Sequence, residues 1–210
     1  MERFIEELKN KPNISNVICD SDKLEVVCDL KIEKKCKDEY IKDSFTIKIS
    51  FLDCEIPQVF ELSRKLKPNY RHMYPGTNRL CLATDLEQKI YLKSNSLSEW
   101  LDEYVEKYFL SYIYYQRYGV FPFGEHTHGV EGLYEFLQER WKTQSIQEAK
   151  NIFEFVCTRE YRGHFECPCG SGKKIRNCHK DLILSLLKNE DELTYLKESY
   201  RRFEDVGRNR

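Results

Sequence analysis

The chain has 210 residues, which is enough for one substantial domain and a smaller module. Its 34 Lys and Arg residues are balanced by 35 Asp and Glu residues, which argues against a dedicated nucleic-acid-binding protein. No apolar run approaches the ~18–20 residues that span a bilayer, so we expect no membrane partner. The acidic N-terminus lacks a signal-peptide pattern, so we expect a cytoplasmic protein. In that reducing compartment, nine cysteines favour metal binding or catalysis over disulfides.

The first part of the chain predicts a short helix followed by an antiparallel sheet. Phe4, Ile5 and Leu8 follow the helical period, and the helix should end before Pro12. Strict alternation of apolar residues then predicts strands with one buried face. The predicted strands are, in chain order, 17–19, 24–32, 45–51 and 59–62, with a charged loop over 33–43 between the second and the third.

Three cysteines belong to these strands or to their ends. Cys28 lies on the apolar face of its strand, and Cys19 and Cys54 lie where strands end. A reduced cysteine in such a position usually behaves as a small hydrophobic side chain. We therefore interpret all three as buried structural residues.

A turn-rich segment, residues 68–86, carries one thiol. Pro75 and Gly76 are typical turn residues, so the chain should reverse shortly before Cys81, which stands between two leucines. A thiol at the edge of a loop can be reached by a bulky partner, and its thiolate is the nucleophilic form. Cys81 is therefore the candidate catalytic residue.

The same segment resembles the active site of ubiquitin-conjugating enzymes. His72 and Tyr74 precede a turn and then Cys81, as a His-Pro-Asn triplet precedes the catalytic cysteine in that family. The pattern is closest to bacterial relatives found in anti-phage operons of the type II CBASS kind. Met73 and Tyr74 stand where the family has proline and asparagine, so the asparagine that stabilises the oxyanion has no clear counterpart. Backbone amides, His72 or Asn78 are the alternatives for that role.

A long helix should follow the cysteine segment. Ser96 and Glu99 form a capping box, and an apolar stripe continues at helical spacing as far as Ile113. We expect this helix to pack on the sheet and to support the segment that carries Cys81. The elements predict an α+β fold. Their order, an N-terminal helix, an antiparallel meander, a cysteine loop and a long helix, is similar to the ubiquitin-conjugating core.

Two histidines, His126 and His128, lie in the Gly- and Pro-containing stretch that follows. One of them could lie beside Cys81 and accept a proton, because imidazole titrates near neutral pH. Alternatively, one bonds a carbonyl group or caps the helix that begins near Val130. A metal site made by these two histidines lacks an obvious further ligand nearby. The resemblance assigns them, with His72, a supporting role.

Two shorter helices and a final helix complete the chain outside its metal motif. Helical periodicity predicts a helix over 130–141 and another that begins at a capping box of Ser145 and Glu148 and ends near Cys157. Neither belongs to a minimal ubiquitin-conjugating core, so we interpret both as a helical extension. A last helix should cover 182–203, with a break near Asn189.

The most specific motif in the sequence has four potential metal ligands, Cys167, Cys169, Cys178 and His179. Three thiolates and one imidazole make the ligand number of a closed tetrahedral zinc site, which predicts Zn²⁺ as a structural cofactor. The motif resembles SEC-C, a small zinc module of the bacterial preprotein-translocase ATPase and of many unrelated proteins. That resemblance implies docking to another macromolecule, as an analogy only.

These features predict a ubiquitin-conjugation-like acyl carrier in bacterial anti-phage defence. The resemblance implies that Cys81 forms a thioester with the C-terminal carboxylate of a protein, either a cyclic-nucleotide synthase or a ubiquitin-like protein, and transfers it to a protein or small amine acceptor. The alternative is a non-catalytic adaptor that binds protein partners through its core and its zinc module. A nucleic-acid-binding zinc knuckle is a third hypothesis, which the near-neutral charge disfavours. The expected parts are a ubiquitin-conjugating-enzyme-like domain (1–128), a helical extension (129–160), a zinc module (161–182) and a C-terminal helix with its tail (183–210).

Overall fold

The computed structural model describes residues 2–52, 55–68, 70–124, 127 and 129–208, with side chains as far as residue 203. The chain forms two compact units, Met1–Glu125 and His126–Arg210, and each is described by itself. Within the described residues, no helix combines the length and the apolar character that crossing a bilayer requires.

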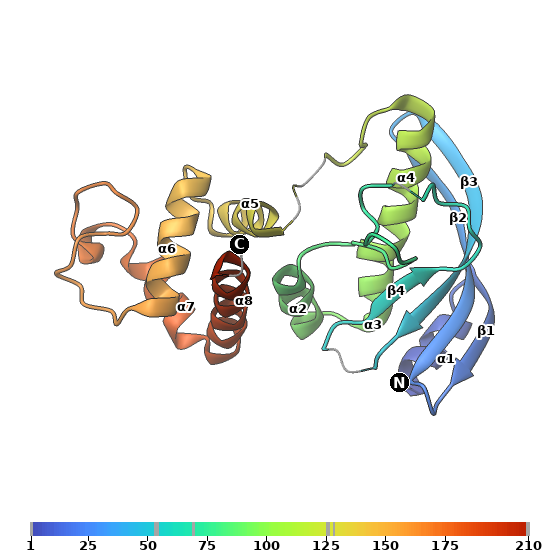
Figure 1. Cartoon of the computed structure of the whole chain (residues 1–210), viewed down its shortest axis with the longest axis horizontal. Helices are drawn as coiled ribbons and strands as arrows, with labels where there is room; N and C mark the ends of the chain where they lie inside the picture. Colours follow the sequence, from blue (N-terminus) through green and yellow to red (C-terminus); the bar gives the residue numbers. More distant parts are fainter. Residues whose placement is uncertain (1, 53–54, 69, 125–126, 128, 209–210) are drawn as a thin grey trace. The chain divides into compact units, whose positions relative to one another are not determined.

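An antiparallel sheet is the scaffold of the first unit (Figure 1). Alternating apolar residues give it one buried face, which includes Val26, Cys28 and Ile47. Helix α1 (Glu2–Lys9) precedes the sheet and buries Leu8. The α+β fold is therefore confirmed. The strands, which lie in this order, are β1 (Ile14–Asp20), β2 (Glu25–Cys36), β3 (Glu39–Ser50) and β4 (Gln58–Glu61).

The charged loop expected over 33–43 is wrong, because β2 and β3 continue through it as a long hairpin. The strands pair as far as Cys36 and Glu39, and the turn between them has Lys37 in the left-handed backbone region (φ 54°). Ile41 and Cys36 are buried and continue the apolar face. The charged residues lie between these positions, where a one-sided strand has its solvent-facing side chains.

The cysteines of the sheet differ from one another in burial. Cys28 is buried as expected, with 1% of its surface exposed. Cys19 is exposed, so its expected burial is wrong. It lies on edge strand β1, whose register with β2 shifts between Ser15 and Ile18. Such an irregularity changes the direction of the side chains that follow it. The expectation for Cys54 falls outside the described residues.

The predicted long helix packs on the buried face of the sheet (Figure 1). It consists of α3 (Leu97–Trp100), a π-helical segment (Leu101–Glu106) and α4 (Lys107–Tyr118). The capping box is confirmed: the Ser96 hydroxyl accepts from the Glu99 amide, and the Glu99 carboxylate accepts from the Ser96 amide. Phe109 stacks on Phe45 of β3, with ring centroids 4.1 Å apart.

Helix α2 (Asp85–Ser94) was not predicted. The side chain of Thr84 caps it by accepting from the Glu87 amide at 3.3 Å. Its buried face includes polar side chains, and Gln88 accepts a hydrogen bond from the indole of Trp100 at 3.1 Å. Buried polar residues weaken the apolar periodicity on which a sequence-based assignment depends.

The second unit is helical apart from the loop that carries the metal motif. A partly buried ion pair joins α5 to α8, with Arg140 Nε 3.1 Å from Glu192 Oε1 and Arg140 Nη2 3.2 Å from Oε2. The predicted break near Asn189 is confirmed, because one helix ends at Lys188 and the next begins at Glu190. The elements are α5 (Gly129–Trp141), α6 (Ile146–Thr158), a 3₁₀ turn (Ile175–Asn177), α7 (Lys180–Lys188) and α8 (Glu190–Arg208).

Candidate functional site

Cys81 lies at the end of a short extended segment that is hydrogen-bonded on both sides. On one side, the Cys81 amide donates to the carbonyl oxygen of His72 at 2.8 Å. On the other side, the amide of Leu80 donates to the carbonyl oxygen of Val59 in β4 at 2.8 Å. The predicted reversal falls between the two halves, where Gly76 has a φ of 71°. The thiol is therefore held by backbone pairing to the sheet.

Helix α4 also holds this segment, through hydrogen bonds of two tyrosine side chains. The hydroxyl of Tyr108 donates to the carbonyl oxygen of His72 at 2.9 Å. The hydroxyl of Tyr112 donates to the carbonyl oxygen of Lys65 at 3.0 Å and accepts from the amide of Lys67 at 3.1 Å. The expectation that the long helix supports the segment that carries Cys81 is therefore confirmed.

The Cys81 side chain is half-buried, and its surroundings shift the pKa of the thiol in opposite directions. Burial raises the pKa of the Cys81 thiol above its ordinary value. A hydrogen bond with Tyr74 and the positive charge of Arg79 act in the opposite direction, and the negative charge of Asp85 adds to the rise. Because burial dominates, the raised pKa keeps the thiol protonated at neutral pH.

His72 contacts the cysteine segment through its backbone. Its carbonyl group accepts the Cys81 amide, and its ring lies edge-on to Phe121 with centroids 5.1 Å apart. The expectations for His126 and His128 fall outside the described residues. Thr127, which stands between them, donates its amide to the Glu135 carboxylate at 2.9 Å. The structure thus brings His72 to the cysteine segment and does not describe the other two histidines.

Sequence reasoning missed Tyr74 as a neighbour of the thiol. Its ring lies under the guanidinium group of Arg79, whose central carbon is 3.7 Å from the ring centroid. The Tyr74 amide also donates to the carbonyl oxygen of Arg79 at 2.9 Å. The alternation of side chains across the turn could have indicated this pair, but only with the pairing register known.

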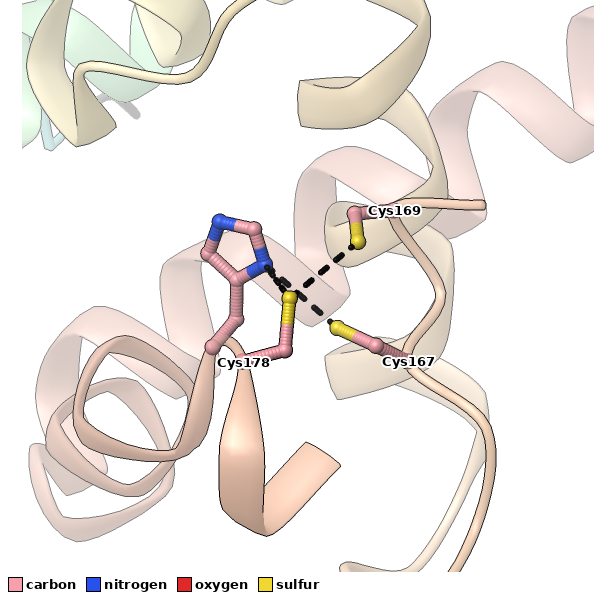
Figure 2. A group of neighbouring side chains, drawn as sticks. Cys167, Cys169 and Cys178 are labelled. Carbon is pink, nitrogen blue, oxygen red and sulfur yellow. Dashed lines mark hydrogen bonds between the residues drawn. The ribbon is translucent and has the colours of Figure 1, made fainter. Parts of the chain in front are cut away.

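The second candidate site is the cluster of Cys167, Cys169, Cys178 and His179 (Figure 2). Its four potential ligand atoms all lie within 4.8 Å of one another. Nδ1 of His179 is 3.4 Å from Sγ of Cys167 and 3.3 Å from Sγ of Cys178, and Sγ of Cys169 is 3.5 Å from Sγ of Cys178. Zinc–sulfur bonds of about 2.3 Å give a tetrahedron with edges of roughly 3.8 Å. The cluster can therefore bind a metal ion.

Local backbone geometry explains how the motif brings these residues together. Gly170 and Gly172 have φ of 82° and 71°, which are left-handed values that favour glycine. The tight fold is closed by the Cys167 amide, which donates to the carbonyl oxygen of Lys173 at 2.8 Å. The 3₁₀ turn that follows, with Ile175 fully buried, places Cys178 against the first two cysteines.

Comparison with known protein families supports the interpretation of the first unit. Residues 7–129 match the family described as type II CBASS E2 protein. The chain belongs to this family. Comparisons with curated proteins and with solved structures found no match. The match covers more than half of the chain and includes Cys81, and the metal cluster lies beyond it. The type II CBASS E2 family is an E2-like family of anti-phage defence, and this chain is such an E2-like protein.

Outside the segment that matches the E2 family, polar contacts surround the metal cluster. The Ser171 hydroxyl lies 3.1 Å from Sγ of Cys169 and 3.4 Å from Sγ of Cys178. Burial raises the pKa of Cys167, whereas at Cys169 hydrogen bonds with Ser171, Cys167 and Cys178 outweigh burial and lower the pKa. Glu148 Oε1 of α6 lies 3.2 Å from Nε2 of His179, the ring nitrogen that faces away from the thiols.

The two sites differ in what they can do chemically. Four protein ligands fill a tetrahedral metal ion, so the cluster leaves no position for a substrate and suits a structural role. Cys81 is half-buried and held by backbone pairing, and a thiol of this kind can act as a nucleophile once it is deprotonated. Cys81 is therefore the candidate nucleophile of the first unit.

Proposed function

We propose that Cys81 carries an acyl group as a thioester in CBASS anti-phage defence. Membership of the type II CBASS E2 family supports this, because Cys81 is the cysteine of the matched segment that is partly accessible and held by backbone pairing. The other described cysteines of the matched segment are Cys28 and Cys36, which are buried in the sheet, and Cys19, which is exposed on the edge strand.

The proposed reaction has two acyl transfers. In the first, Cys81 Sγ attacks the carbonyl carbon of an activated C-terminal acyl group, the leaving group departs, and the thiol proton is released to it through solvent. In the second, an amine attacks the thioester carbon, the Cys81 thiolate departs, and the amine loses a proton. The donor must arrive activated, for example as a thioester on another protein, because a free carboxylate does not react with a thiol.

The partners follow from the family and from the chemistry. CBASS E2 proteins act with protein partners of their operon. We propose that the donor is a protein with a C-terminal carboxylate, either a cyclic-nucleotide synthase or a ubiquitin-like protein, and that the acceptor is a protein or small amine. Both Cys81 and the metal ligands must stay reduced, which suits a cytoplasmic reaction.

We also propose that the cluster of the second unit is a structural zinc site of the SEC-C kind. Three thiolates and an imidazole are the ligands that zinc prefers, and the ligand atoms are close enough for a tetrahedral ion. One zinc ion per chain, measured by elemental analysis of freshly purified protein, is the expected result. Protein without bound metal, or with iron in its place, would overturn this assignment.

One observation favours a second function, that of a non-catalytic adaptor. Burial raises the pKa of Cys81, so at neutral pH the unassisted thiol is a poor nucleophile. The same E2-like core would then bind a protein partner, and the second unit would bind another.

The decisive experiment is the intact mass of Cys81→Ser protein that is co-expressed with its operon neighbours. Serine forms an oxyester, which is more durable than a thioester, so the proposal expects an added protein mass on this variant that mild hydroxide removes. Cys81→Ala is the negative control. Cys19→Ser is the matched control, because it changes an exposed thiol of the same unit and should leave transfer intact. Absence of an adduct on both Cys81→Ser and wild-type protein would support the adaptor.

A further inference from the structure

The pairing register around Cys81 decides which side chains share the face of its thiol. Residues that are paired across an antiparallel ladder share a face, and so do alternate residues along each strand. Met73 pairs with Leu80, and the buried side chain of Leu80 marks the face that points to the core. The other face carries four side chains, those of His72, Tyr74, Arg79 and Cys81.

Within this group, Arg79 fixes the ring of Tyr74. The two residues are paired through the backbone, and the guanidinium carbon lies 3.7 Å from the ring centroid. A cation over an aromatic face is attracted by the ring quadrupole, so the contact restricts a side chain that is otherwise 36% exposed. Burial raises the pKa of Tyr74, although Arg79 lowers it in part. The hydroxyl therefore stays protonated at neutral pH and can donate a hydrogen bond.

Tyr74 and Cys81 share this face, and although burial raises the pKa of the Cys81 thiol, a hydrogen bond with the Tyr74 side chain lowers it in part and so favours the thiolate. A hydroxyl group that donates to sulfur stabilises negative charge there, and the neighbouring guanidinium group adds positive charge. In an acyl transfer, negative charge moves from this sulfur to the oxygen of the carbonyl group that bonds to it. A donor that is already fixed beside the sulfur can stabilise charge at both places without reorganisation.

We propose that Tyr74 is a catalytic hydrogen-bond donor for acyl transfer at Cys81, and that Arg79 is the residue that positions it. The inference deepens the proposed function and rests on it. In the step concerned, the thiolate lone pair forms the S–C bond while the C=O π electrons become the oxyanion lone pair. The oxyanion then re-forms the carbonyl group, and the leaving group departs with its bonding electrons and takes a proton from solvent. Tyr74 donates its hydrogen bond throughout and keeps its proton.

The test compares Tyr74→Phe with wild-type protein in two assays. The first is the rate at which iodoacetamide alkylates Cys81 as a function of pH, followed by peptide mass spectrometry. The second is the rate of adduct formation at Cys81 with the operon neighbours present. Tyr40→Phe is the matched control, because it removes an exposed tyrosine hydroxyl from the β2–β3 hairpin of the same unit. Arg79→Lys keeps the charge but loses the planar group that covers the ring.

Tyr74→Phe should shift the alkylation profile to higher pH and lower the adduct rate by on the order of 10²–10³-fold, the usual effect of losing one oxyanion donor. Arg79→Lys should give a smaller loss in both assays, and Tyr40→Phe should match wild type. Wild-type rates for Tyr74→Phe in both assays would overturn the proposal. If wild-type protein forms no adduct, the proposed function fails, and an unshifted alkylation profile would then separately overturn the contact of Tyr74 with the thiol.

Discussion

Glu148 shows how a residue far from the metal motif in sequence can act on it. Its carboxylate lies 3.2 Å from Nε2 of His179, and it also accepts from the Gln144 amide at 2.6 Å. A carboxylate can only accept a hydrogen bond, so this contact requires the proton on Nε2 and leaves the lone pair of Nδ1 facing the thiols. Glu148 is buried, with 9% of its surface exposed. It therefore fixes both the tautomer and the orientation of the His179 ring, as a carboxylate beside a metal-binding histidine does.

We predict that Glu148 controls metal affinity. Glu148→Leu should lower zinc affinity about 10–100-fold, because the histidine loses the partner that orients it. Glu148→Gln should lose less, because its amide oxygen can still accept from Nε2. The measurement is competition with a chromophoric chelator. Glu154→Gln, a change at a more exposed carboxylate of the same helix, is the control. Equal affinities for the leucine variant and wild type would contradict this role.

The aromatic face of α4 holds the segment before Cys81. Tyr112 is buried, and its hydroxyl joins Lys65 and Lys67 to the helix through two backbone hydrogen bonds. Removing that hydroxyl leaves an amide and a carbonyl group without these partners. Leaving a buried donor or acceptor without a hydrogen-bond partner lowers the free energy of unfolding by about 1–3 kcal/mol.

We therefore predict that Tyr112→Phe destabilises the first unit by about 1–2 kcal/mol, as measured by urea unfolding. Its local effect should be faster hydrogen exchange at the amide of Lys67, which separates a lost contact from a general loss of stability. Tyr114→Phe is the control on the same helix, because its ring packs on Tyr118, with centroids 4.6 Å apart. Unchanged exchange at Lys67 in Tyr112→Phe would show that the hydroxyl does not hold this segment.

Local sequence patterns predicted much of the fold, and tertiary contacts explain the elements that these patterns did not predict. The alternation around Cys28 and the capping box at Ser96 were sufficient to predict a sheet and a long helix. The end of the β2–β3 hairpin was missed because exposed charges separate the buried residues Cys36 and Ile41. Helix α2 was missed because Gln88 is buried against a tryptophan that follows later in the chain.

The same distinction holds for the sites. The spacing of the metal motif predicted the cluster around His179, because adjacent ligands in one tight loop need little tertiary information. Cys81 was indicated by its turn and by resemblance. The sequence did not indicate Tyr74 and Arg79, because their positions beside the thiol depend on the pairing register of the strands. It did not indicate Glu148 either, because that contact depends on the packing of α6 against the metal loop.

Each of the two compact units has an apolar core, and the loop over 159–179 is the segment that depends on another source of stability. The first has a hydrophobic core between its sheet and its long helix. In the second, α5, α6 and α8 bury an apolar core of their own, which includes Leu137, Phe153 and Leu196. The loop over 159–179 is different, because only Cys167 and Ile175 are buried in it. Ordering the backbone of a residue costs ~1–2 kcal/mol of conformational entropy. The burial of two residues therefore offsets little of the cost of ordering the roughly twenty residues of this loop.

A zinc ion bound at the proposed site would supply most of the order of this loop, since a structural zinc site contributes about 10–16 kcal/mol when it forms. We predict that Cys167→Ser, or zinc removal by a chelator, makes 159–179 sensitive to trypsin at Arg162, Lys173 and Arg176 while the helices of both units stay protected. Limited proteolysis with mass spectrometry measures this. Cys157→Ser is the matched control, because it changes a cysteine of α6 outside the cluster and should keep both the metal and the protection. Protection of the loop in metal-free protein would show that its order comes from packing, and early cleavage in the first unit would show that the units are coupled.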